Sequence, residues 1–206
     1  MKPRTKTILL TGVLGVIWAG AVGAGLRILM TYETAPGRVG AVPTSWPADS
    51  SIPLARDRPT LVMAAHPQCP CTSASMDELA QVIARIQNKA RAYVLFYTPS
   101  GSGLDWKNAD LRRTAEKIPG VTVLSDVDGV EAQRLGAKTS GHTFLFDRNG
   151  RLLFSGGITA SRGHSGDNAG ESSIVSLINN GTSGRANSFV FGCSLTDRNR
   201  QAPCLK

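Results

Sequence analysis

From residue 59 to residue 180, short apolar runs of strand length alternate with segments whose apolar residues recur at helical spacing. Strands joined by crossover helices are parallel and covered on both faces, so this alternation predicts an α/β fold. Asn149-Gly150 between the last two apolar runs predicts a hairpin that adds an antiparallel edge. The expected strands are 60–65, 92–97, 121–124, 143–146 and 151–154, and the expected helices are a segment that reaches residue 86, then 105–117, 130–135 and 172–180.

Two thiols one residue apart, Cys69 and Cys71, lie where the first strand gives way to the first helix. A cysteine at a helix N-terminus feels the positive end of the macrodipole and gains thiolate character. Ser75 with Glu78 matches a capping box, which would start the helix one turn later and weaken this effect. We therefore expect thiol and disulfide chemistry at Cys69 and Cys71.

The N-terminal segment indicates in which cellular compartment the domain lies. Residues 7–26 contain no charge and are long enough to cross a bilayer as a helix, and Lys2, Arg4 and Lys6 precede them. The positive-inside rule then keeps the first residues in the cytoplasm and exports the rest. A cleavable signal peptide, cut after small residues near 19–21, is the alternative. We expect an uncleaved anchor at 1–30, which makes this a single-pass protein of the cytoplasmic (inner) membrane with its domain on the periplasmic or extracytoplasmic side.

The rest of the chain divides into three parts. Residues 31–58 are rich in proline and predict a semi-extended linker, residues 59–180 form the α/β domain, and residues 181–206 form an extension with Cys193 and Cys204. In an oxidising compartment a Cys193–Cys204 bridge is expected. Cys193 beside Cys69 as a resolving thiol is the alternative, because four cysteines allow three pairings.

The formal net charge of +8 comes from scattered lysines and arginines. Without a basic run interleaved with aromatic residues, this pattern favours solvation and attraction to anionic lipid. We expect no nucleic-acid partner, and contact with the lipid bilayer through the N-terminal helix.

The dithiol behind the first strand and the late run Gly136-Ala-Lys-Thr-Ser-Gly-His-Thr-Phe-Leu-Phe-Asp147 with Gly150 resemble the thioredoxin superfamily. The resemblance covers about residues 59–180 and is closest to membrane-anchored, exported proteins of the TlpA/ResA-like or RedB-like kind. It implies a thioredoxin-like fold, with a central mixed sheet flanked by helices. It also implies a thiol-disulfide oxidoreductase or isomerase that acts on the thiols or disulfides of exported proteins.

Two positions depart from that family's pattern. Thr72 stands where the second cysteine of Cys-x-x-Cys would fall, and His142 stands at the cis-proline position. A non-proline cis bond is costly, so Gly141-His142 is expected to be trans, with His142 opposite the dithiol where it could tune the thiolates.

The spacing of the thiols suggests two chemistries. A Cys-x-Cys disulfide closes a small ring whose preferred torsion is hard to reach, and such a bond would oxidise or isomerise partners. We expect no cofactor for this reaction. The alternative is a copper-binding chaperone for a respiratory metal site, because thiolates and imidazole suit Cu(I), with Cys69, Cys71 and His66 as its ligands.

Overall fold

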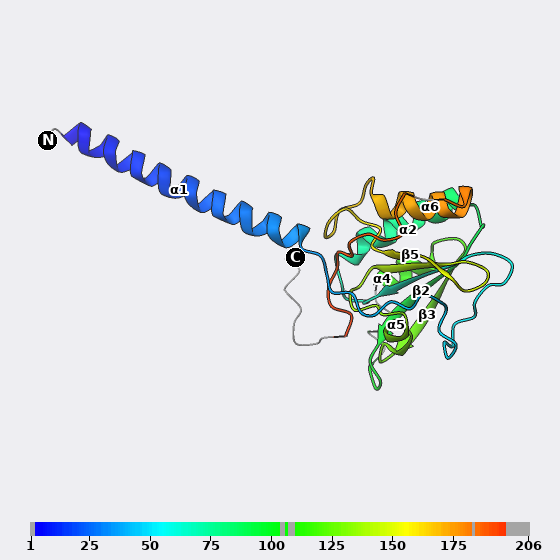
Figure 1. Cartoon of the computed structure of the whole chain (residues 1–206). Helices are drawn as coiled ribbons and strands as arrows, with labels where there is room; N and C mark the ends of the chain where they lie inside the picture. Colours follow the sequence, from blue (N-terminus) through cyan, green and yellow to red (C-terminus); the bar gives the residue numbers. More distant parts are fainter. Residues whose placement is uncertain (1–2, 104–105, 107–109, 183, 197–206) are drawn as a thin grey trace. The chain divides into compact units, whose positions relative to one another are not determined.

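The computed structural model describes residues 3–103, 106, 110–182 and 184–196. The chain divides into two compact units, residues 1–35 and residues 36–206. The first unit consists of one continuous helix, α1 (Pro3–Thr34; Figure 1). The segment Thr7–Thr34 of α1 is long and apolar enough to cross a membrane, a property that a signal sequence shares.

The second unit is built on a five-stranded mixed sheet in the order β3-β2-β1-β4-β5. The strands β1, β2 and β3 are parallel, whereas β4 and β5 are antiparallel to their neighbours. This is the thioredoxin-like mixed sheet that the sequence predicted. The strands are β1 (Thr60–Ala65), β2 (Arg91–Thr98), β3 (Val121–Val127), β4 (His142–Phe146) and β5 (Leu152–Gly156).

Within the described residues of the domain, four helices flank the sheet. Along one face α2 and α6 lie side by side, and α4 packs on the same core (Figure 1). The apolar side of α5 packs on the opposite core. The helices are α2 (Thr72–Ile86), α4 (Asp110–Glu116), α5 (Val130–Arg134) and α6 (Ala169–Asn180). The predicted helix 105–117 is thus seen from Asp110; positions 105 and 107–109 lie outside the described residues.

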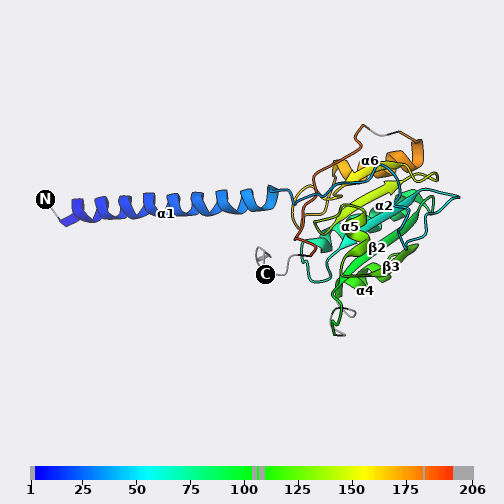
Figure 2. The ribbon, with the colours of Figure 1, turned by 60° about the horizontal axis from the view of Figure 1, so that its bottom comes forward.

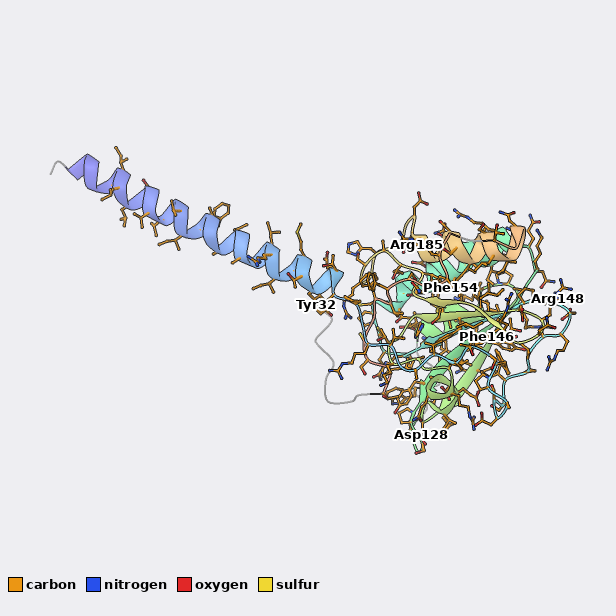
Figure 3. The ribbon with its side chains drawn as sticks, in the orientation of Figure 1. Tyr32, Asp128, Phe146, Arg148, Phe154 and Arg185 are labelled. Atoms are coloured by element: carbon orange, nitrogen blue, oxygen red, sulfur yellow. The ribbon has the colours of Figure 1, made fainter. Side chains whose placement is uncertain are left out.

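The alternation of side chains along each strand divides the interior into two cores. Phe154 belongs to the core under α2 and α6, and Phe146 belongs to the core on the side of α5. Both side chains are fully buried, and Figure 3 labels them within the domain. The hairpin between their strands forms as predicted: Gly150 has a φ of 85°, and the Asp147 carboxylate accepts hydrogen bonds from the backbone N–H groups of Asn149 and Arg151.

The segment 31–58, predicted as a semi-extended linker, belongs to the domain from residue 36 onward. Ile52 is only 3% exposed in the α5-side core, and the Trp46 ring meets Phe146 edge-on with 5.0 Å between centroids. The N–H of Trp46 donates to the carbonyl of Gly150 at 2.7 Å. Proline excludes regular structure here but does not prevent packing. Since α5 has only five residues, residues 36–58 supply the apolar cover that this face of the sheet needs.

The extension after α6 also returns to the domain. Residues 184–196 run back along it in Figure 2 (orange to red), and Val190 and Leu195 are buried. Ser155 donates its N–H to the Ala186 carbonyl at 3.0 Å, and Gly157 donates to Phe189 at 3.2 Å. The predicted boundary at residue 180 therefore does not separate a free tail from the domain. This return brings Cys193 to the end of the sheet where Cys69 and Cys71 lie.

Candidate functional site

Residues 66–71 join the end of β1 to the start of α2, and Cys69-Pro70-Cys71 is the part next to the helix. Cys71 is the N-cap residue of α2, and the helix begins at Thr72 rather than at Ser75. The Cys69 N–H donates to the His66 carbonyl and the Thr72 N–H donates to the Cys69 carbonyl, both at 3.1 Å. The segment is therefore already coiled, and both thiols lie at the positive end of the helix.

The capping box expected from Ser75 and Glu78 does not form the start of α2. Glu78 is fully buried, and its carboxylate accepts hydrogen bonds from the Gly166 N–H at 2.6 Å and the Asn168 amide at 3.3 Å. The carboxylate thus holds the loop before α6 against α2. Asn168 in turn caps α6 by accepting from the Glu171 N–H at 2.8 Å.

A third sulfur completes the site. The Sγ atoms of Cys69 and Cys193 are 2.9 Å apart, and the Sγ atoms of Cys69, Cys71 and Cys193 all lie within 4.8 Å of one another. Cys69 is 2% exposed and Cys71 is 8% exposed, whereas Cys193 is partly exposed. A reagent approaching from solvent therefore reaches Cys193 first. Cys204, the expected partner of Cys193, lies outside the described residues.

Backbone pairing fixes the position of Cys193. The Ser140 N–H donates to the Cys193 carbonyl and the Leu195 N–H donates to the Lys138 carbonyl, both at 2.9 Å, and Ser194 forms an antiparallel bridge with Thr139. The C-terminal segment thus lies as an added strand-like edge beside the turn before β4. No local pattern around residue 193 predicts this pairing, because it depends on groups more than 50 residues earlier in the chain.

The surroundings of Cys69 stabilise its thiolate. Hydrogen bonds from Cys193 and then from Cys71 hold the pKa of the Cys69 thiol far below its usual range, and Thr72 acts in the same direction. Burial opposes them, because it disfavours the charged form. Cys69 is therefore the sulfur that holds negative charge at neutral pH.

Ser140, which the sequence analysis did not single out, forms hydrogen bonds that connect the parts of the site. Its hydroxyl oxygen accepts from the His66 N–H at 2.8 Å and lies 2.7 Å from the Thr72 hydroxyl, with either of the two hydroxyls as donor. Thr72, at the place of the usual second cysteine, therefore links the start of α2 to the turn before β4. Each of these three residues is buried, so the links are shielded from water.

The His66 imidazole faces aromatic side chains. It stacks on Tyr97 with 5.8 Å between centroids and meets Trp106 edge-on at 5.3 Å, and its Nδ1 accepts from the Gln68 N–H at 3.2 Å. Burial lowers the pKa of His66, although the negative charge of Cys69 acts in the opposite direction. Among the described residues, the group whose donor atoms converge contains the three cysteines and does not include His66.

His142 does not have the position expected of it. The Gly141–His142 peptide bond is trans, as predicted. Its Nε2 lies 2.8 Å from the Ser155 hydroxyl, and its ring packs on Phe144 with 4.1 Å between centroids. The ring thus lies on the α5-side face of β4. The residues of this turn that do reach the thiol end are Ser140, and Gly141, whose N–H donates to Ala64 at 2.8 Å.

Comparisons with known proteins support the fold, whereas the chemistry has to be argued from the residues of the site. No protein-family model matches the chain, and neither does any curated protein. An uncharacterized conserved protein from Geobacillus kaustophilus is similar with a TM-score of 0.56 and 16% identity, covering 81% of this chain and 94% of that one. A hypothetical protein from Sinorhizobium meliloti 1021 is similar with a TM-score of 0.53 and 18% identity, covering 81% and 96%. Both similarities concern the fold.

Proposed function

We propose that this protein is a thiol-disulfide oxidoreductase whose redox pair is Cys69 and Cys193. The observation that carries the proposal is the 2.9 Å separation of their Sγ atoms at the N-terminus of α2. Two sulfurs this close need only a small movement to reach the bond length of about 2.05 Å. The pairing departs from the expected Cys69–Cys71 couple, and it gives the C-terminal extension a part in the chemistry.

The exposure of Cys193 and the negative charge of Cys69 determine which sulfur takes part in each step of the exchange. In the oxidised protein, the thiolate of a partner attacks the accessible Sγ of Cys193, and the Cys193–Cys69 bond breaks with its electron pair passing to Cys69. Cys69 is the better leaving group because its thiolate, at the N-terminus of α2, still accepts hydrogen bonds from Cys71 and Thr72 when Cys193 is bound to the partner. The second thiolate of the partner then attacks the partner sulfur bound to Cys193 and releases the Cys193 thiolate. The partner gains one disulfide, and Cys69 and Cys193 gain two electrons.

The stabilised thiolate of Cys69 also determines the direction in which electrons flow. A reduced form that is stabilised by a low thiol pKa makes the corresponding disulfide more oxidising. We infer that the protein oxidises dithiols or shuffles disulfides in its partners rather than reducing them. Cys71 supports this role by donating a hydrogen bond to Cys69 in the reduced form.

A groove beside Cys193 offers a place for the partner chain. A cavity of about 840 Å³ includes Gly192 and Ser194, the two neighbours of Cys193, in its lining. Arg38, Lys138 and Arg162 also line it, and Asp128 supplies the carboxylate. The excess of positive charge favours a partner segment that carries acidic residues next to its cysteines.

Single-turnover oxidation of a dithiol peptide tests the function. Oxidised full-length protein in detergent is mixed with the reduced peptide, and disulfide formation is followed by mass spectrometry. We expect Cys69→Ser and Cys193→Ser to abolish turnover, and Cys71→Ser and Cys204→Ser to retain it. Mapping of the oxidised protein should show a Cys69–Cys193 bond. Turnover that survives Cys193→Ser, or a Cys69–Cys71 bond in the mapped protein, would overturn the proposal.

We further propose that the domain acts outside the cytoplasm while α1 anchors it in the inner membrane. The length and apolar composition of α1 support this placement, as do the basic residues that precede its uncharged run. Alkaline phosphatase fused after residue 206 should be active in cells, which it is only when exported. The mass of the mature protein should include residues 1–35; a cleaved N-terminus would show that the helix is a signal sequence instead.

A further inference from the structure

The three sulfurs of the site also form a converging donor set. Cys69 and Cys71 come from the start of α2, and Cys193 comes from the C-terminal segment, yet their Sγ atoms all lie within 4.8 Å of one another. Three atoms this close can bind a single ion without rearrangement of the sheet or of α2. This set differs from the ligand set expected from the sequence, because Cys193 takes the place given to His66.

The chemistry of the sulfur donors determines which metal ion fits the site. Thiolate sulfur is a soft ligand, which favours Cu(I) and Zn(II) over the hard cations that oxygen binds. Structural zinc sites are almost always completed by four protein ligands. Among the residues that the structure describes, the converging group has three members, and neither ring nitrogen of His66 belongs to it. Three sulfurs without a fourth protein donor fit Cu(I) better than zinc.

The surroundings suit a small anionic complex. One Cu(I) with three thiolates carries two negative charges, and the N-terminus of α2 presents the positive end of its dipole to Cys69 and Cys71. The Arg162 guanidinium donates to the carbonyl of Gly192, next to Cys193, and adds a positive charge nearby. Burial of Cys69 and Cys71 keeps out water and larger competing ligands.

One adjustment is required, and the side chain of Cys193 can make it. With metal–sulfur bonds of about 2.3 Å, ligands at tetrahedral or trigonal angles stand roughly 3.8–4.0 Å apart. The separation of the Cys69 and Cys193 sulfurs therefore has to grow by about 1 Å on binding. Backbone pairing holds the main chain of Cys193, but its side chain is partly exposed, so its Sγ can move away from the buried Cys69 by a side-chain rotation.

We propose that Cys69, Cys71 and Cys193 form a three-thiolate site for Cu(I). Binding releases the protons of whichever thiols still carry them, and copper stays in the +1 state, so no electron is transferred. A Cys69–Cys193 disulfide removes two of the three ligands, which makes copper occupancy and the oxidised state mutually exclusive. The site goes beyond the proposed oxidoreductase function and does not depend on turnover.

Anaerobic titration of reduced, full-length protein in detergent with Cu(I) tests the site, in competition with a chromophoric Cu(I) chelator. We expect one Cu(I) per chain. X-ray absorption of the wild-type complex should show three sulfur neighbours and no nitrogen neighbour, a result that needs no variant to fold. Pre-oxidation of the protein should abolish binding, and reduction should restore it.

Variants then assign the ligands. Loss of a supporting residue outside the ligand set typically costs 10–100-fold in metal affinity, so loss of a ligand in Cys69→Ser, Cys71→Ser or Cys193→Ser should cost more than about 100-fold. Cys204→Ser is the matched control and should bind as the wild type does, and circular dichroism verifies the fold of each variant. A nitrogen neighbour, tighter binding of Zn(II) than of Cu(I), or affinity lost in Cys204→Ser but kept in Cys193→Ser would overturn the proposal. The stoichiometry, the sulfur neighbours and the variant affinities are all measured on reduced protein without a dithiol substrate, so either proposal can fail without the other.

Discussion

Gly192 packs so closely on Ser140 that a Cβ atom at residue 192 would lie 2.0 Å from the Ser140 carbonyl oxygen. The obstacle is backbone, which cannot move aside as a flexible side chain can. Since residue 192 precedes Cys193, this contact sets how deeply the C-terminal segment sits over Cys69. The close approach therefore controls the distance between the two sulfurs.

We predict that Gly192→Ala displaces the C-terminal segment and separates Cys193 from Cys69. Cys69 should become more exposed, so its rate of alkylation in the reduced protein should rise, and less Cys69–Cys193 disulfide should form on oxidation. Peptide mapping after a timed pulse of iodoacetamide measures both. Gly184→Ala is the matched control, because a Cβ atom there meets nothing within 4 Å. Equal alkylation rates in the two variants would contradict the prediction.

The charge on Cys69 should be visible as a titration. The Cys193 hydrogen bond is the largest influence that lowers the pKa of Cys69. The ultraviolet absorbance of one thiolate in the reduced protein should therefore persist well below about pH 8.5, the usual thiol midpoint. In Cys193→Ala, which removes the donor, that midpoint should move upward. An unchanged midpoint would show that the hydrogen bond from Cys193 does not stabilise the thiolate.

His142 should make stability dependent on pH. Burial lowers the pKa of its imidazole to about 4 in the folded protein, whereas in the unfolded chain it stays near 6.5. Between these values the unfolded state binds more protons, so stability is complete above pH 6.5 and falls as pH decreases toward 4. The loss should approach about 3 kcal/mol in the free energy of unfolding, from 1.36 kcal/mol per pKa unit.

Urea denaturation at several pH values measures this dependence. His142→Gln removes the titrating group and keeps an amide that can bond to the Ser155 hydroxyl. The variant should show a flatter stability profile than the wild type between pH 6.5 and pH 4. A profile as steep as that of the wild type would place the responsible group elsewhere.

The packing of residues 36–58 predicts a stability effect that a free linker would not show. Ile52→Ala deletes a side chain that is 3% exposed in the α5-side core, and we expect it to lower the free energy of unfolding by about 2–4 kcal/mol. Val39→Ala, in the same segment but 47% exposed, should change it by less than about 0.5 kcal/mol. Chemical denaturation of both variants checks the difference. Equal, small effects of the two substitutions on the free energy of unfolding would show that residues 36–58 are only a tether.

Local patterns in the sequence determined the elements of the sheet and the place of the dithiol. Apolar runs of strand length and helical spacing are local properties, and Asn149-Gly150 specifies its turn through backbone preferences alone. For the same reason the uncharged run in α1 could be read directly as a helix able to cross a membrane. The alternation of elements was sufficient to predict parallel strands covered by helices with an antiparallel edge, and the thioredoxin-like fold came from the family resemblance.

The tertiary structure decided what lies around the dithiol. Cys193 and Cys69 meet across 124 positions, through backbone hydrogen bonds that any residue type can make, so their pairing leaves no mark in the local sequence. The helical turn formed by residues 69–72 determines where α2 begins. Glu78 does not cap that helix, because its carboxylate accepts a hydrogen bond from the loop before α6. His142 turned to the face of β4 that carries Phe144, because strand alternation, and not position in the motif, sets which way a side chain points.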